Sequence, residues 1–361
     1  MNTKPMAISL AQTTMMRYPD PESYPYMPWC YPHGYLLMGF ARLWEATGDS
    51  RYFEYIQGYC DRHVSADGCV RGFDGNSMDN IMPGAVLVWL YEQTGQKKYE
   101  LACRRIRAAF DDYPRTREGG FLHCRHEHPG EMWIDGVFMG QMFECRYGRA
   151  FHEDACFAET IRQLRLIYRY CHVADGLLLH GYSEEASTPW ADAQGRSCAV
   201  WSEGLGWYAL MLAEALGMIP KGFPGRDAVE DQLRQLMVGL KKHQDPATGL
   251  WFQVVNSGDD PRNWCDTSGS AMFLYCALEA IRLDIVKEQD YQPMTESAYQ
   301  GLLTRAVLSP DGGIDILHAC DGVCVQLSQD AYLNYKQVIN AKEAVCGYLW
   351  AMIRYEFSAP C

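Results

Sequence analysis

One acidic side chain stands alone in an apolar stretch of the sequence. Asp135 lies two residues after Trp133 and directly before Gly136, where a loop is expected to become a helix. Burial among apolar neighbours disfavours the charged form of a carboxyl group and raises its pKa toward the pH at which proton transfer is efficient. Asp is also a favoured N-cap residue. Asp135 is therefore a candidate for either a catalytic acid or a helix cap.

A second carboxylate, Asp79, lies near the start of the preceding apolar helix. Glycoside chemistry usually requires two carboxyl groups that flank the bond, one of them with a raised pKa. Asp79 together with Asp135 would supply such a pair. The alternative is an N-cap, or an Asx turn with Asn80.

The histidine-rich run 123–128 could suggest a metal ligand set, but its spacing matches no standard zinc pattern. We expect no metal here. His123 is instead expected to point into a cavity and to bond a hydroxyl or carboxylate group.

These side chains must be positioned by a repeated element. Six times along the chain a glycine precedes an apolar helical run, and room for one amphipathic helix follows most of these runs. The six starts are predicted at Gly34, Gly84, Gly136, Gly206, Gly269 and Gly347.

Six nearly all-apolar helices inside a ring of amphipathic helices predict an all-α fold, the (α/α)6 barrel. A stacked α-solenoid would require a shorter and more regular period. No composition shift divides the chain, so residues 1–361 are expected to form a single domain, with 1–28 as an N-terminal lead-in. If the inner helices are parallel, all six starts lie at one end of the barrel.

The residues before these starts are rich in Trp, Tyr, His, Asp and Asn. They include Tyr31 before the first start, His180 and Trp201 before the fourth, and Asn340 before the sixth. Aromatic faces stack on sugar rings, and carboxylates, amides and imidazoles bond hydroxyls. The alternative is ordinary core and rim packing, but the recurrence beside polar residues favours a carbohydrate site.

The composition limits the classes of partner. The net charge of −13 over 361 residues argues against nucleic acid and anionic membrane surfaces as partners. No apolar stretch is long enough for a transmembrane span, and no secretory signal is evident. The fifteen cysteines lie mostly in apolar runs without a CxxC pair, as in a protein of the reducing cytoplasm.

The sequence resembles the unsaturated uronyl hydrolases of glycoside hydrolase families 88 and 105, and most closely the unsaturated rhamnogalacturonyl hydrolases of family 105. The resemblance runs from about Trp29 to the C-terminus. It is carried by the stretches 29–34, 78–80, 120–123, 132–136, 180–182, 190–192, 201–207 and 267–268.

The resemblance implies hydration of the C4=C5 double bond on a terminal uronic acid, without a cofactor. The residue in the Asp135 position would donate a proton to C4, and water would add at C5. Asp79 would hold substrate or water, His180 would bond substrate, and Tyr31 and Trp207 would supply stacking faces. The candidate substrate-binding residues are Tyr31, His123, Arg125, Trp133, His180, Trp201, Glu203 and Trp207.

The implied substrate is a small oligosaccharide with a terminal unsaturated uronic acid, of the Δ4,5-galacturonyl-rhamnose type produced when pectin or rhamnogalacturonan is degraded. We expect a monomer or a homodimer, and the sequence does not distinguish between them. Relatives commonly carry an arginine at the Glu203 position and a basic residue at the Cys124 position. Either Arg125 or His123 replaces that charge here, or the substrate differs.

Two other functions remain open from the sequence. A sugar epimerase or isomerase on the same barrel would use His123 and His180 as a pair, which leaves Asp135 without a role. A sugar-binding homologue that has lost activity would explain Glu203.

Overall fold

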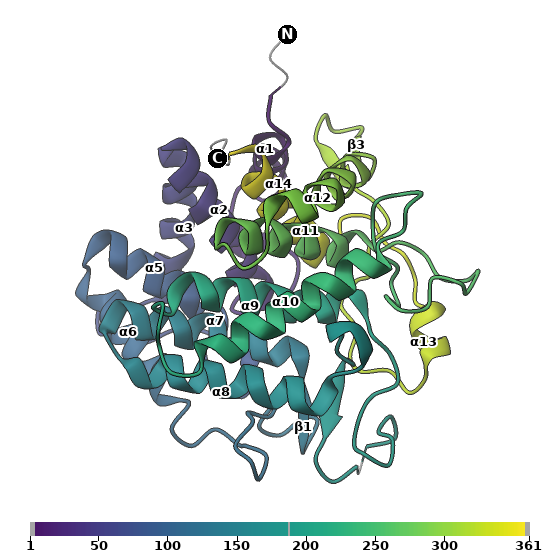
Figure 1. The fold of residues 1–361 in the computed structure, drawn as a ribbon. Helices are drawn as coiled ribbons and strands as arrows, with labels where there is room; N and C mark the ends of the chain where they lie inside the picture. The colour runs from purple at the N-terminus through teal and green to yellow at the C-terminus, as the bar shows by residue number, and fades with distance from the viewer. Residues whose placement is uncertain (1–3, 187, 358–361) are drawn as a thin grey trace.

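Six long inner helices form a closed ring in the computed structural model, which describes residues 4–186 and 188–357 (Figure 1). Each inner helix contacts the next one along the chain, and the last contacts the first. The inner helices are α2 (Tyr31–Thr47), α5 (Gly84–Thr94), α7 (Ile134–Phe151), α9 (Ser202–Met218), α11 (Thr267–Arg282) and α14 (Lys342–Glu356). The predicted (α/α)6 barrel is confirmed.

Each inner helix is covered by one outer helix, as α8 and α10 show at the front of the molecule (Figure 1). The outer helices bury one face, as the spacing of Val229, Leu233, Leu236 and Leu240 illustrates for α10. They are α1 (Met6–Arg17), α3 (Ser50–His63), α6 (Lys97–Ala108), α8 (Asp154–Cys171), α10 (Arg226–His243) and α12 (Glu288–Leu303).

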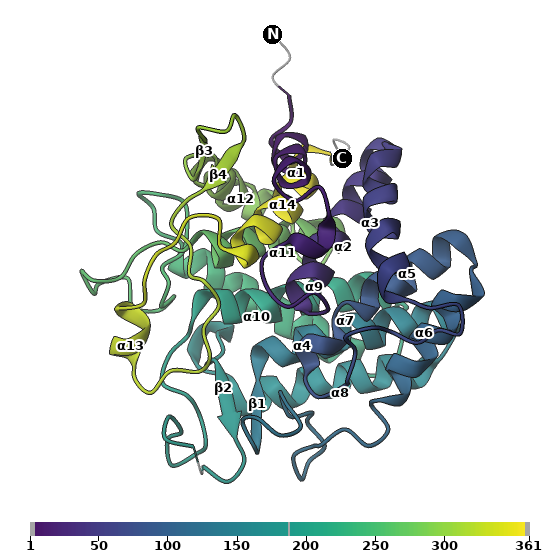
Figure 2. The same ribbon diagram turned by 180° about the vertical axis from the view of Figure 1, so that it is seen from behind.

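The segment 1–28, expected as a lead-in, contains the outer helix α1, which packs on α14 (Figure 2). The backbone N–H groups of Met6 and Ala7 donate to the Glu356 carboxylate, each over 2.9 Å. A carboxylate at a helix N-terminus satisfies N–H groups that have no partner inside the helix. The last helix pair therefore combines segments from opposite ends of the sequence.

Short elements lie in the connections between the long helices. Two antiparallel strand pairs form, β1 with β2 and β3 with β4. The short elements are α4 (Met78–Ile81), α13 (Gln329–Leu333), the 3-10 helices η1 (Pro21–Ser23) and η2 (Ala174–Gly176), and the strands β1 (Glu131–Trp133), β2 (Gly181–Ser183), β3 (Ala306–Leu308) and β4 (Ile314–Ile316).

The expected glycine starts need a correction. Only Gly84 opens its helix; the other five glycines lie inside helices that begin earlier, as Gly269 does in α11. A Cβ on Gly269 would stand 2.7 Å from backbone and side-chain atoms of Ser202 in α9. The absent side chain therefore allows two inner helices to approach closely, which is a packing role.

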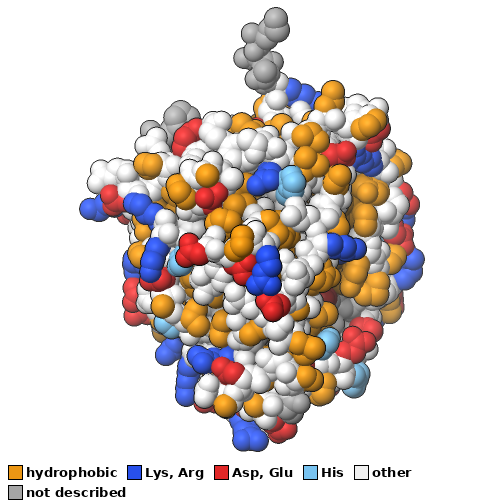
Figure 3. All heavy atoms as spheres, turned by 90° about the vertical axis from the view of Figure 1, so that its right-hand side faces the viewer, with side chains coloured by type: hydrophobic (Ala, Val, Ile, Leu, Met, Phe, Trp, Pro, Cys, Tyr) orange, Lys and Arg blue, Asp and Glu red, His pale blue; other side chains and the backbone are white. Residues whose placement is uncertain are grey.

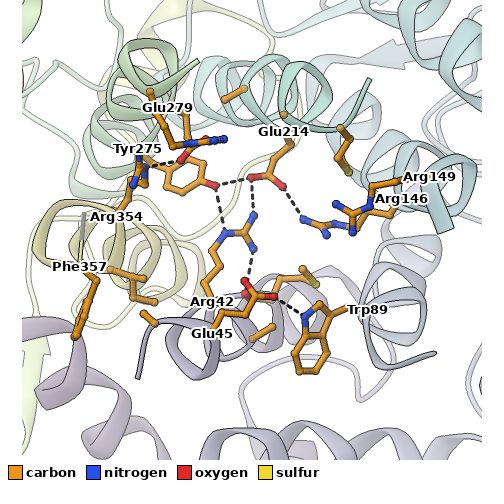
Figure 4. A pocket seen from close by; sticks show the side chains of 18 of the residues that line it. Arg42, Glu45, Trp89, Arg146, Arg149, Glu214, Tyr275, Glu279, Arg354 and Phe357 are labelled. Atoms are coloured by element: carbon orange, nitrogen blue, oxygen red, sulfur yellow. Dashed lines mark hydrogen bonds and ion pairs between the residues drawn. The ribbon is translucent and has the colours of Figure 1, made fainter. Parts of the chain in front are cut away.

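The two ends of the ring differ in chemistry. At the end where the inner helices finish, a cavity of about 550 Å³ is lined by arginines and glutamates (Figure 4). Glu214 accepts hydrogen bonds from Arg42, Arg146 and Tyr275 there. Cations near helix C-termini are favourable, because the unpaired carbonyl groups give that end a negative potential.

The opposite end carries the long connections and α13. Acidic, basic and hydrophobic side chains are interspersed on this side of the surface (Figure 3). None of the helices in the described ranges has the length and hydropathy needed to cross a membrane. Every cysteine within those ranges is a free thiol.

Candidate active site

A cavity of about 340 Å³ opens where the inner helices begin. Asp79 and Asp135 both line it, so the structure brings the two predicted carboxyl groups together. The inner helices are parallel, because residues near their starts line this cavity and residues near their ends line the cavity at the other end of the barrel. The lining residues are Tyr26, Tyr31, Asp79, His123, Trp133, Asp135, Met139, Trp201, Glu203, Trp207, Asp321, Gly322, Val323, Cys324 and Lys342.

Asp135 is the second residue of α7 and is only 9% exposed. The N-cap position is Trp133, which makes no side-chain cap, so Asp135 is not the helix cap. Strand pairing sets its place: Trp133 in β1 faces Gly181 in β2, and the Ile134 N–H donates to the His180 carbonyl over 3.1 Å. The carboxyl group is therefore held beside His180 by the backbone.

His180 lies behind Asp135 and has no exposed surface. Its Nε2 is 3.1 Å from Oδ2 of Asp135, although the angle is not that of an aligned hydrogen bond. Its Nδ1 is 2.7 Å from the Tyr332 hydroxyl, which accepts the Gln326 backbone N–H over 3.1 Å. When the hydroxyl donates its proton to Nδ1, the ring proton lies on Nε2, facing Asp135.

Asp79 stands on the second position of the short helix α4, where Ser77 is the N-cap residue. Its Oδ1 is 3.8 Å from Nε2 of His123. Desolvation by the cavity walls, together with the charge of Asp135, raises the pKa of Asp79 to about 7. The Asx alternative also fails, since the Asn80 side chain bonds the backbone of Trp29, Gly72, Asp74 and Gly75.

His123 is stacked on Trp133, with ring centroids 4.3 Å apart and planes 16° from parallel. Burial lowers the pKa of His123 to about 4, so the ring is neutral near pH 7. A Cβ on Gly136 would stand 2.8 Å from Nδ1 of His123. The glycine after Asp135 therefore gives room for the histidine between the two aspartates.

A group of buried acids forms the far side of the cavity. Glu203, on the first turn of α9, accepts a hydrogen bond from Oγ of Ser268 over 2.6 Å. Burial and the charges of Glu343 and Asp266 raise the pKa of Glu203 well above its usual range. The Tyr31 hydroxyl donates to Glu343, whose pKa burial also raises.

All four aromatic residues predicted to bind substrate reach the cavity. Trp133, Trp201 and Trp207 line it, and Trp207 meets the ring of Tyr31 edge to face at 6.0 Å. Trp201 also packs against His180, with 4.5 Å between ring centroids.

Arg125 is not brought to the cavity. Its guanidinium donates to the carbonyls of Gly75, Ala109 and Asp112 and to the Asp112 carboxylate. This arginine holds loops together, so the expectation that it binds substrate is not supported. Likewise, buried His180 contacts Asp135 and not the open cavity.

Several residues at the site were missed from the sequence, among them Asp321, Gly322 and Lys342 in the cavity wall. Tyr332 and Glu343, which bond His180 and Tyr31, were missed as well. Lys342 and Glu343 form the first turn of α14. An earlier start for the sixth inner helix would have pointed to both, because the other first turns carry site residues. No signal in the sequence distinguishes Tyr332.

A second cavity of about 700 Å³ adjoins the first and shares Tyr26, Asp79, His123, Trp133 and Cys324 with it. The combined space extends from Asp135 toward the loops before α2 and α4. In the described part of the chain, no three His, Cys, Asp or Glu side chains gather as a metal ion would require.

The sequence model of Glycosyl Hydrolase Family 88 matches residues 7–358. The chain belongs to glycosyl hydrolase family 88. It is therefore a glycoside hydrolase, and the cavity at the helix starts is the candidate active site of this family 88 hydrolase.

Three proteins show how far the similarity extends. Protein Atu3128 of Agrobacterium fabrum is 32% identical over 165 residues, which are 45% of this family 88 chain and 70% of that protein. Unsaturated rhamnogalacturonyl hydrolase YesR of Bacillus subtilis is 26% identical over 258 residues, covering 67% and 68% of the two chains. A solved C. acetobutylicum glycoside hydrolase from family 105 is 27% identical, with a TM-score of 0.91 over 98% of this chain and 99% of its own.

Proposed function

We propose that this glycoside hydrolase acts on oligosaccharides that carry a terminal unsaturated uronic acid, by hydrating the C4=C5 double bond with Asp135 as general acid and base. The observation that carries the proposal is the position of Asp135, buried in the wall of the cavity and 3.1 Å from His180. The similarity to a protein named unsaturated rhamnogalacturonyl hydrolase supports this substrate class.

The reaction follows from the bonds that must change. Asp135 gives a proton to C4, and a water oxygen bonds to C5 while its proton returns to the carboxylate. The C5 hemiketal then opens to a ketone as the ring oxygen leaves C5. The hemiacetal thus formed at C1 becomes an aldehyde and releases the remaining sugar as an alcohol. Proton transfer of this kind typically contributes about 10²–10⁴ to the rate.

The helix starts favour an anionic ligand. The N-terminal turns of α2, α7, α9 and α14 contribute Tyr31, Asp135, Glu203 and Lys342 to the cavity. A helix N-terminus carries about half a positive charge, so several of them around one cavity stabilise a carboxylate there. Asp79 would hold the substrate or the attacking water.

The other two functions fit the site less well. An epimerase that alternates between two histidines needs both rings at the substrate, but His180 has no exposed surface. Loss of activity through Glu203 would follow from an added negative charge, and burial, which raises the pKa of this group, disfavours that charge.

We further propose Δ4,5-galacturonyl-rhamnose from rhamnogalacturonan as the substrate and the cytoplasm as the location. The name of the B. subtilis relative and the free thiols support these two points.

The test is a panel of lyase-generated unsaturated disaccharides from pectin and from glycosaminoglycans, followed by the ultraviolet absorbance of the conjugated C4=C5 acid. We expect loss of absorbance with a pectin-derived member, and a product mass that includes added water. An epimerase would leave the mass unchanged. Binding without any absorbance loss over hours would identify an inactive sugar-binding protein.

A further inference from the structure

The active-site cavity contains one permanent positive charge. Among the described residues that line it, Lys342 is the single lysine or arginine. It is the first residue of α14, and its side chain is 11% exposed. A uronate carboxylate that enters this cavity can therefore pair with one cationic side chain in the wall, that of Lys342.

Contacts on several sides hold the Lys342 ammonium group in place. Its Nζ is 2.9 Å from Oε1 of Glu343 and 3.2 Å from Oδ1 of Asp321, and it lies 5.2 Å from the ring centroid of Tyr26. Burial opposes its charge, but the contacts with Glu343 and Asp321 outweigh this effect and raise the pKa of Lys342. The lysine therefore remains charged across the working pH range.

One of these two acidic partners is replaceable. Glu343 is fully enclosed and also accepts the Tyr31 hydroxyl, so its contact with Lys342 is structural. The Asp321 side chain is 40% exposed and has no other hydrogen bond within the described ranges. Asp321 is the more exposed member of this pair, so water can solvate its carboxylate when another carboxylate takes its place on the ammonium group.

Space for a ligand beside the ammonium group is provided by Gly322. A Cβ at this position would stand 3.0 Å from Oε1 of Glu343, 3.4 Å from the Tyr31 hydroxyl and 3.5 Å from Nζ of Lys342. The residue has a positive φ of 49°, which favours glycine. A side chain here would fill the space between the ammonium group and the tyrosine.

The other cations near the site are unsuited to this role. The guanidinium of Arg125 is committed to backbone carbonyls and Asp112, and His123 is neutral near pH 7. Arg71 lines the adjoining cavity and pairs with Glu22 over 2.8 Å.

We propose that Lys342 binds the carboxylate group of the unsaturated uronic acid, which takes the place of Asp321 on the ammonium group. This inference rests on the proposed function and assigns a specificity residue within it. Lys342 thereby places the C5 carboxyl group at the α14 side of the cavity. The C4=C5 bond then faces Asp135 on the opposite wall. Burial raises the pKa of neighbouring Glu203, which weakens its repulsion of the carboxylate.

The experiment compares the acid form of an unsaturated disaccharide with its uncharged methyl ester. Both retain the conjugated double bond, so both are followed by ultraviolet absorbance. The wild-type enzyme should have a lower KM for the acid than for the ester. Lys342→Met should raise KM for the acid about 10- to 100-fold, because a hydrogen bond between charged groups contributes binding free energy of that size. The KM for the ester should stay unchanged. The kcat for the acid should change by less than about threefold, as expected for a lost uniform binding contact.

Two further variants keep the test independent of folding defects. Lys342→Arg retains the charge and should retain the preference for the acid. Asp321→Asn removes the competing partner and should lower KM for the acid a few-fold, with no effect on the ester. Exposed Lys336 provides a charge-matched control as Lys336→Met, and Arg71→Met tests the cation of the adjoining cavity as the rival.

The outcomes separate the two proposals. A wild-type enzyme that consumes no unsaturated uronide overturns the proposed function itself. An active wild-type enzyme whose Lys342→Met variant still prefers the acid, or whose preference disappears in Arg71→Met, overturns only the assignment of Lys342.

Discussion

Nε2 of His180 lies 3.1 Å from Oδ2 of Asp135, and the two residues are joined through one pair of short strands. The backbone hydrogen bond from the Ile134 N–H to the His180 carbonyl fixes the distance between the helix that carries the acid and the residue before β2 that carries the imidazole. The Tyr332 hydroxyl then orients the ring from behind. A buried, oriented partner of this kind keeps a catalytic carboxyl group in one position.

Replacement of Asp135 by asparagine should abolish activity and leave the fold intact. The amide has nearly the same shape but cannot transfer a proton, so we expect kcat to fall by about 10²–10⁴ or more. Ultraviolet absorbance measures the rate, and circular dichroism measures the melting temperature. Asp330→Asn on α13, where the side chain is 71% exposed, is the control and should behave as wild type. Retained turnover in Asp135→Asn would rule out the mechanism.

Removal of the Tyr332 hydroxyl should affect catalysis through His180. Tyr332→Phe leaves Nδ1 buried without a donor, which costs about 1–3 kcal/mol of stability. The Nε2 proton is then no longer specified, so we expect kcat to fall about tenfold with little change in KM. Tyr335→Phe, on the same segment but without a hydroxyl hydrogen bond in the described structure, is the matched control. Equal kcat values for the two variants would contradict a role of Tyr332 in orienting His180.

The raised pKa of Asp79 predicts a pH-dependent stability difference. The folded-state pKa of about 7 lies above the ordinary value of 3.8, so the folded state binds the proton more tightly. The stability associated with the neutral carboxyl group is therefore complete below pH 3.8 and is lost as the pH rises through about 7. The asparagine in Asp79→Asn does not ionise. The melting temperature of this variant should therefore rise relative to that of the wild type as the pH increases from 4 to 8. A difference that does not change with pH would show that Asp79 is not desolvated.

Gly136→Ala should disturb His123. The new Cβ would stand 2.8 Å from Nδ1, so the ring must move away from its stack on Trp133. Such overpacking costs about 1–3 kcal/mol, and we expect kcat/KM to fall about tenfold. Gly58→Ala in the outer helix α3 has nothing within 4 Å of the new Cβ and should stabilise the protein by about 0.5–1 kcal/mol. Chemical denaturation measures the free energy of unfolding, which should fall in Gly136→Ala and rise in Gly58→Ala.

The cavity at the far end of the barrel should matter for stability and not for turnover. Glu214→Gln leaves Arg42 and Arg146 buried without their shared carboxylate. Breaking a buried pair on one side typically costs about 3–5 kcal/mol. We expect a large loss in the free energy of unfolding with kcat per folded molecule unchanged at 25 °C. A fall in kcat without a loss of stability would instead connect this end to the reaction.

The barrel was predictable because its pattern is redundant. Inner helices such as α9 are buried on nearly every side, whereas outer helices such as α10 bury one stripe, and this contrast is visible in the residue types. The position of Asp135 was predictable for the same reason, as a single acid in an apolar first turn. The predicted helix starts were less accurate than the predicted fold. Glycines such as Gly269 allow two helices to approach closely and do not mark the boundary of a helix.

The rest of the site depends on contacts that the sequence does not encode locally. Tyr332 reaches His180 across 152 positions of the chain, and Tyr31 reaches Glu343 across 312. Arg125 was expected at the cavity because it lies near His123 in sequence, but the loop turns its guanidinium toward Asp112. Proximity along a loop does not determine the direction of a side chain.

The link from Glu356 to the first turn of α1 joins residues 350 positions apart. During synthesis on the ribosome, α1 precedes α14 and lacks its main partner until α14 has followed. A nascent chain without its last helix lacks Lys342 and Glu343 and exposes the apolar sides of α2 and α11. Closure of the barrel is thus expected to be a late, slow step of folding, during which the chain depends on chaperones to avoid aggregation.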